Sequence, residues 1–233
     1  IPRKDTVQFD DTNQISEFGE IGGDYEHTFA NNARWKTLFI LNKKEDDSTR
    51  ERFNVDAKAR EKDLFLANFN RYQERIIRSS YSFAFAGSQN IEVGIERAQT
   101  ILDSSLQLGL LSDTRMVSQN FGGLSEVNNT NATVEELRYE SFIIHNFQIN
   151  SRMSLETTLI IETSEIAQSG DVSKKRDFDF IRPKVDYRFD LTPSLQFRAT
   201  VEKSVSQLSF NDFTANTNSG DEDLNTIAGN PEL

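Results

Sequence analysis

The chain of 233 residues contains no cysteine, two histidines and no uninterrupted run of 18 apolar residues. The lack of cysteine excludes disulfides, thiolate metal sites and cysteine nucleophiles. His27 and His145 alone offer little for a histidine-based metal or catalytic site. The lack of a long apolar run excludes a transmembrane helix. It leaves a transmembrane β-barrel open, because barrel strands are marked by alternation and not by mean hydropathy.

Positive charge is also scarce, since 26 Lys and Arg stand against 37 Asp and Glu and give a net charge of −11. A nucleic-acid-binding protein needs a concentrated positive field to meet phosphates, so we expect no nucleic-acid partner. The sequence begins with Ile-Pro-Arg-Lys and shows no charged-then-apolar leader. We therefore expect it to be a piece of a larger protein.

From Gly19 onward the dominant period is two, which favours strands over helices. Alternation persists for about 9–16 residues per segment, whereas strands of soluble proteins are commonly about 5–6 residues long. A tilted strand needs about 9–11 residues to span a membrane. The alternating segments are residues 19–29, 35–42, 74–85, 91–99, 136–148, 155–162, 181–190 and 195–202. The pattern predicts an all-β fold, an antiparallel up-and-down meander of about eight long strands that is part of a transmembrane β-barrel.

Short and long connections alternate in this prediction. Tight turns are expected near Asn31, Ser88, Asn150 and Pro193, where turn-forming residues gather. Long polar loops are expected at residues 43–62, 112–133, 164–175 and 211–225, and the residues before Ser16 show no pattern. A transmembrane barrel keeps short periplasmic turns at one end and longer extracellular loops at the other, so this alternation supports a barrel.

The two faces of the predicted strands differ in chemistry. We expect the apolar face to touch lipid through Ile143, Leu159, Ile161, Val185 and Val201. The opposite face of residues 181–190 carries alternating charges, and these would cost several kcal/mol each if left unpaired in a dry cavity. They are expected to border water or a polar plug. Aromatic residues cluster near the tight turns, as in an interfacial girdle.

The sequence offers no convincing catalytic or metal-binding constellation. No serine has an attendant base, and neither histidine has acidic neighbours at ligand spacing. The acidic clusters at residues 46–47 and 221–223 are typical of solvated loops. We therefore predict no enzymatic activity, no metal and no cofactor.

The last third of the chain carries a set of family motifs. They are an Arg182-Pro183 pair, a short Thr192-Pro193 turn, residues 207–213, and the run Gly229, Asn230, Pro231 and Leu233. In this order and spacing they resemble the middle and late barrel of TonB-dependent outer-membrane receptors. Gly22-Gly23-Asp24-Tyr25, with Trp35-Lys36, resembles an earlier hairpin of that barrel.

The resemblance implies part of a 22-stranded barrel, plugged by an N-terminal domain, in the bacterial outer membrane. Such a receptor imports a scarce nutrient, a siderophore, cobalamin or a glycan fragment, with energy from the inner membrane delivered by the TonB complex. No plug domain is recognised here, so residues 1–233 are expected to be one barrel segment. The loops at 43–62 and 112–133 would help form the outer vestibule, and the ligand-binding residues are unknown.

Two alternatives stay open at the level of sequence. An autonomous eight-stranded outer-membrane barrel with a structural or adhesive role would pair the strand near Tyr25 with the strand near Phe197. A soluble β-sandwich, or a soluble barrel that binds a small apolar ligand, would bury the apolar face against a second layer.

Overall fold

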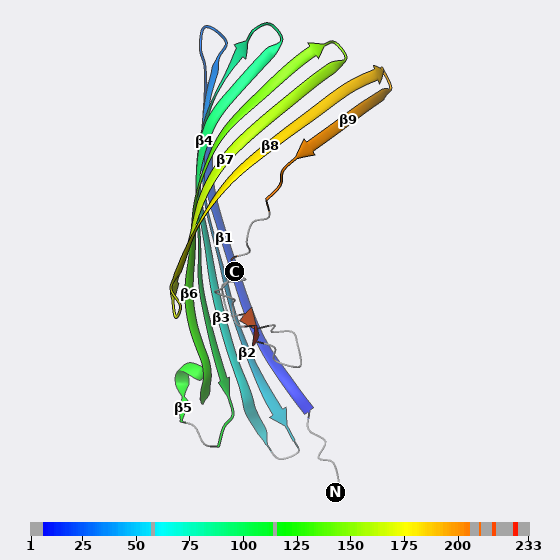
Figure 1. The fold of residues 1–233 in the computed structure, drawn as a ribbon. Helices are drawn as coiled ribbons and strands as arrows, with labels where there is room; N and C mark the ends of the chain where they lie inside the picture. The colour runs from blue at the N-terminus through cyan, green and yellow to red at the C-terminus, as the bar shows by residue number, and fades with distance from the viewer. Residues whose placement is uncertain are drawn as a thin grey trace.

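A computed structural model describes residues 7–56, 59–113, 116–205, 210, 216–217 and 226–227. Eight long strands form one antiparallel sheet in chain order (Figure 1), which confirms the predicted meander. These strands are β1 (Val7–Thr28), β2 (Arg34–Val55), β3 (Arg60–Phe85), β4 (Gln89–Leu110), β6 (Leu124–Asn150), β7 (Met153–Gly170), β8 (Lys174–Thr192) and β9 (Leu195–Glu202). The shorter elements are β5 (Val117–Ser118), η1 (Gln119–Phe121), β10 (Asn216–Thr217) and β11 (Thr226–Ile227).

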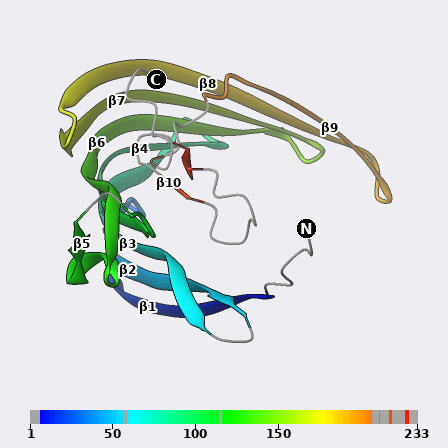
Figure 2. The same cartoon turned by 90° about the horizontal axis from the view of Figure 1, so that it is seen from below.

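The sheet curves into an open trough, which Figure 2 shows from one end. Its strand order runs β1-β2-β3-β4-β6-β7-β8-β9, so β1 and β9 are the two edges and do not pair with each other. The pairing that an autonomous eight-stranded barrel requires is therefore not formed by the described strands. The prediction attached to that alternative is wrong for this fold.

The four predicted tight turns are confirmed and lie together at the top of Figure 1. In the first turn Asn32 adopts a left-handed φ of 61°, and the amide of Phe29 donates to the carbonyl of Ala33 over 2.8 Å. Asn tolerates this conformation at low cost. In the later turns, side-chain oxygens of Asn150 and Thr192 accept from the amides two residues ahead.

The predicted long loops are largely wrong, because most of their residues continue the strands. Residues 43–55 belong to β2, residues 124–133 to β6 and residues 164–170 to β7, and β1 begins at Val7. The loop expected at 112–133 shrinks to residues 111–123, which include β5 and η1. The loop expected at 211–225 falls almost wholly outside the described residues.

Ion pairs join neighbouring strands in the parts of β1, β2 and β3 that extend beyond the predicted alternating segments. Arg52 forms a two-pronged contact with Asp63, at 3.1 Å for each bond, and Lys62 reaches Glu51 at 2.6 Å. Arg50 binds Asp10 in the same two-pronged way. In residues 43–52 of β2 the side chains are polar on both faces, so no apolar alternation identifies this part of the strand in the sequence.

The core also lies in these extensions, on the concave face of the sheet. One cluster comprises Leu64, Leu66, Leu106 and Leu108, with Leu110 packed against it. A second comprises Val134 and Ile166, with Phe178 and Phe210 against them. The sequence analysis did not foresee these clusters, because all of these residues lie outside the alternating segments and one of them, Ile166, lies in the loop expected at 164–175.

Candidate functional site

Directly opposed residues in an antiparallel pair share a face, so the register assigns each side chain to one side of the sheet. Tyr81 is opposite Val93, Val93 is opposite Ile143, and Ile143 is opposite Leu159. This row belongs to the exposed face, because odd-numbered residues alternate with less exposed even-numbered ones along β7 and β8. A curved sheet crowds its concave side, so the odd-numbered face is convex. We call it the outer face.

Near the tight turns, the outer face contains a continuous surface that we call the outer apolar band. It consists of the odd-numbered residues in 19–27, 35–41, 77–85, 89–95, 137–147, 153–163, 181–189 and 195–201. No Asp, Glu, Lys or Arg occurs among them. Charges begin at the next outward-facing position on β2, β3 and β4, as Lys43, Arg75 and Arg97. The band therefore has a sharp edge.

The register also gives the tilt of the strands. Arg34 pairs with Ser82, but the next tight turn begins three residues further on, after Phe85. Gln89 pairs with Phe147, and β6 again runs three residues further, to Asn150. Successive hairpins are thus offset by three residues, which is about 10 Å along the strand direction, and each hairpin is about 9.6 Å wide. If all the tight turns lie at the same height in the membrane, this offset corresponds to strands tilted by about 45° from the membrane normal. At this tilt a band of about nine residues is about 20 Å tall, close to the roughly 25 Å of outer-membrane barrels.

All five residues proposed to face lipid lie in this band and are exposed. The exposed fraction is lowest for Leu159, at 37%, and highest for Val201, at 75%. The others are Ile143, Ile161 and Val185. The second protein layer that a soluble sandwich would place over this face is not present among the described residues.

Aromatic side chains concentrate where the outer apolar band meets the tight turns. Tyr25 packs edge-on against Trp35 with ring centroids 5.8 Å apart, and Phe29 contacts Tyr81 in the same manner. The indole of Trp35 donates a hydrogen bond of 2.8 Å to Ser79 Oγ. An apolar ring with a satisfied polar atom is suited to a membrane interface.

The inner face at the same height carries what we call the inner charged network, formed by Arg78, Glu96, Arg138, Glu140, Glu162 and Arg182. Arg182 of β8 lies 2.8 Å from both Glu140 of β6 and Glu162 of β7. Arg138 links Glu140 at 3.3 Å to Glu96 of β4 at 3.5 Å. The network therefore ties strands β3 to β8 together across the inner face.

The motif residues within the described range occupy defined positions. Arg182 belongs to the inner charged network, and the carbonyl of the neighbouring Pro183 accepts from the amide of Lys203 over 3.0 Å. Proline has no amide to donate in return, and the paired residues of β9 end at this level, at Glu202. Thr192 and Pro193 form the last tight turn. Gly229, Asn230, Pro231 and Leu233, like residues 207–209 and 211–213, lie outside the described residues.

Neither histidine gathers ligands. His145 lies on the outer face and contacts Gln89 Oε1 at 2.8 Å, while His27 packs against Phe29. Within the described part of the chain, no group of three or more His, Asp or Glu side chains could hold a metal ion. The same residues include no helix that is long and apolar enough to cross a membrane.

Comparison with known proteins gives one structural similarity. No family model and no curated protein matches the sequence. The fold is similar to the crystal structure of the ferric citrate transporter FecA in the unliganded form, with 14% sequence identity and a TM-score of 0.44. The similarity covers 73% of this chain and 27% of the transporter chain, so this chain spans about a quarter of that protein's length.

Proposed function

We propose that this chain is part of an outer-membrane β-barrel receptor of the TonB-dependent type, which imports a scarce nutrient. One observation carries the proposal: an exposed outer band without a single charged residue stands opposite a charged inner face. Lipid tails would cover the first surface, and water or a polar plug would cover the second. A charge at the centre of such a band costs about 2–4 kcal/mol, so a membrane barrel needs this exclusion and a soluble sheet does not.

Residues 1–233 would supply one segment of the barrel wall. The tight turns would face the periplasm, because the strands extend far beyond the outer apolar band only at the opposite end. Plug domain, coupling to the TonB complex and the remaining strands would belong to other parts of the full-length protein. The transported ligand would be a siderophore, cobalamin or a glycan fragment.

A cysteine scan along the outer face of β8 tests membrane insertion. Asp177, Ile181 and Val185 are all exposed in the fold, and the chain has no cysteine of its own. Each is replaced by Cys in the full-length protein in outer-membrane vesicles, and labelling by a water-soluble maleimide is measured. We expect Asp177→Cys to react, and Ile181→Cys and Val185→Cys to react only after the membrane is dissolved. Equal labelling at all three positions before dissolution would contradict the proposal.

Import is tested separately, by uptake. A strain that lacks the full-length gene is compared with its parent for uptake of a labelled ferric siderophore, cobalamin and an oligosaccharide, each with and without TonB. A TonB-dependent loss of one uptake supports the receptor. No loss in any of the three would overturn the import function while leaving membrane insertion intact.

A further inference from the structure

Positive charge collects along part of the edge of the outer apolar band. Lys43, Arg75 and Arg97 lie on the outer face of β2, β3 and β4, directly beyond the band, and Arg71 lies two outward-facing positions past Arg75 on β3. We call these four residues the outer basic rim. On β1, β6, β7 and β8 the first charged residues beyond the band are acidic: Glu17, Glu135, Glu165 and Asp179. A chain with a net charge of −11 thus keeps one sector of this edge basic.

The cations of the outer basic rim have few carboxylate partners. Glu45 forms ion pairs with two of them, Lys43 at 2.9 Å and Arg71 at 2.6 Å. Arg75 donates a hydrogen bond of 3.4 Å to the amide oxygen of Gln73. Within the described ranges, no carboxylate lies within 4.0 Å of the guanidinium of Arg75 or Arg97. These donors are therefore available to an external anion.

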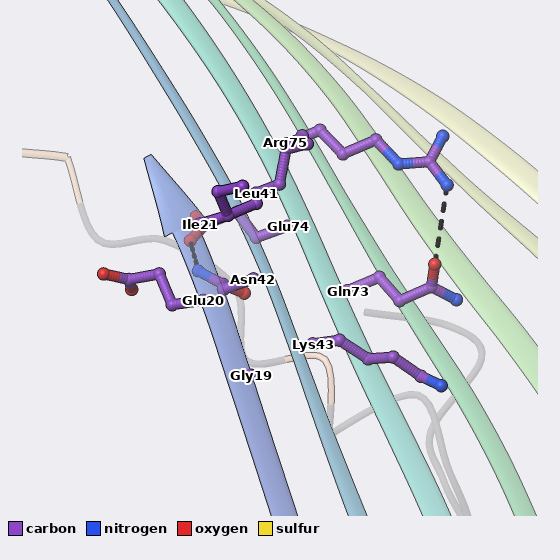
Figure 3. Close-up of a pocket in the computed structure, with 9 residues that line it drawn as sticks. All are labelled: Gly19, Glu20, Ile21, Leu41, Asn42, Lys43, Gln73, Glu74 and Arg75. Atoms are coloured by element: carbon purple, nitrogen blue, oxygen red, sulfur yellow. Dashed lines mark hydrogen bonds between the residues drawn. The ribbon is translucent and has the colours of Figure 1, made fainter. Parts of the chain in front are cut away.

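A hollow of about 390 Å³ opens at this edge, between β1, β2 and β3 (Figure 3). Six of its lining residues face outward: Gly19, Ile21, Leu41, Lys43, Gln73 and Arg75. The other three, Glu20, Asn42 and Glu74, belong by register to the inner face, where Asn42 donates a hydrogen bond to Glu74 over 2.8 Å. A Cβ atom built at Gly19 would meet nothing within 4 Å, so the missing side chain leaves the space open. Ile21 and Leu41 belong to the band, whereas Lys43 and Gln73 lie beyond it. The hollow thus joins an apolar wall to a cationic one.

We infer that this hollow binds the phosphate headgroup of a membrane lipid, whose acyl chains run over Ile21 and Leu41. The inference rests on the proposed insertion of the outer apolar band into the membrane. Arg and Lys are suited to such a headgroup, because their charged hydrogen bonds to phosphate are strong and their stems lie along apolar surface. A free phosphate would use the cations but not the apolar wall, so the joined surfaces favour the lipid.

The test uses the full-length protein reconstituted in phosphatidylcholine nanodiscs that contain a small share of phosphatidic acid. Bound phosphatidic acid is counted by native mass spectrometry. We expect Lys43→Ala, Arg75→Ala and Arg97→Ala to weaken binding about fivefold for each cation removed, from the roughly 1 kcal/mol that a basic residue contributes at an anionic membrane surface. Gly19→Leu, which fills the hollow without changing charge, should also reduce binding.

The matched control is Lys175→Ala, on the outer face of β8 beyond the same band, where Glu165 already pairs with the lysine at 2.7 Å. It should retain all bound lipid. Equal lipid binding by the triple variant and the parent, both inserted in the nanodisc, would overturn the lipid site and leave the proposed function standing. Displacement of the lipid by inorganic phosphate alone would also overturn it, in favour of a free-phosphate site. Failure of the parent protein to insert would overturn both proposals.

Discussion

Gly94 and Phe142 face each other across β4 and β6, and the glycine makes room for the ring. A Cβ atom at position 94 would collide with the ring and lie 2.7 Å from the carbonyl oxygen of Ser79. The guanidinium of Arg78 lies over the ring, 4.2 Å from its centroid. Because Gly94 has no side chain, the ring of Phe142 fits on the inner face beside the inner charged network.

We expect Gly94→Val to destabilise the protein by about 1–3 kcal/mol, because overpacking forces the ring and the neighbouring backbone apart. The measurement is the urea midpoint of unfolding from lipid vesicles. Gly19→Ala is the control, since its added methyl group enters open space. An unchanged midpoint for Gly94→Val would contradict the assigned packing.

A charge placed in the outer apolar band tests the facing of individual residues. Ile143→Arg and Val185→Arg should each cost about 2–4 kcal/mol of membrane assembly if they lie near the midplane. Arg188→Ala should cost little, because Arg188 lies on the inner face and its ion pair with Asp190 is solvent-exposed, with 53% of the Arg188 side chain accessible. Assembly is measured by the fraction of protein that becomes protease-resistant in vesicles. If all three substitutions left assembly unchanged, the assignment of Ile143 and Val185 to the lipid-facing side would be refuted.

At the scale of the strand, sequence periodicity predicted the whole of β9 and, in the other seven long strands, only the part that carries the outer apolar band. Residues 43–52 illustrate the reason: their side chains are polar on both faces, so no period of two separates them from a loop. What keeps them extended is pairing with β1 and β3, which depends on partners far away in the sequence. Likewise, no local pattern could show that Arg182 meets both Glu140 and Glu162.

Arg182 joins three strands, so its removal should be costly. Arg182→Met leaves two carboxylates facing each other, and Glu162 is only 8% exposed. Breaking a fully buried pair costs about 3–5 kcal/mol, and we expect about 2–3 kcal/mol here because the Arg182 side chain is 26% exposed. Adding Glu162→Gln should recover part of the loss in a double-mutant cycle of unfolding free energies. Strict additivity of the two changes would show that the network is not coupled.

We expect acid to destabilise the parts of β1, β2 and β3 that lie beyond the outer apolar band. The hydrogen bonds from Lys43 and then Arg71 lower the pKa of Glu45, and those from Lys44 and Ser16 lower the pKa of Asp46. A carboxyl whose pKa is lowered by folding stabilises the fold above its ordinary pKa, and this contribution is lost as the pH falls through the lowered value. The urea midpoint should therefore fall as the pH drops below about 4. Glu45→Gln should reduce the midpoint at neutral pH and have no effect in acid.

For the molecule as a whole, the alternation of faces and the four tight turns were sufficient to predict the meander and its apolar side. The curvature and the register were not predictable, because they arise from pairing along the full strand length. The sharp edge of the outer apolar band was not predictable either, because it depends on how the register aligns Leu41, Ile77 and Ile95 with their neighbours.

The stagger of the turns predicts a strand tilt of about 45° from the membrane normal. Polarised infrared spectroscopy of the amide bands in oriented bilayers of the full-length protein measures this angle directly. A tilt well below 35° would be outside the range of outer-membrane barrels and would contradict the register.

Every long strand except β9 continues past the outer apolar band, so in the proposed orientation this part of the wall projects from the cell surface. The outer ends of β2 and β3, and those of β7 and β8, would then stand well clear of the bilayer edge. Foreign peptides grafted at these tips would project into the surrounding medium without disturbing the anchored half, which would make the chain a scaffold for surface display.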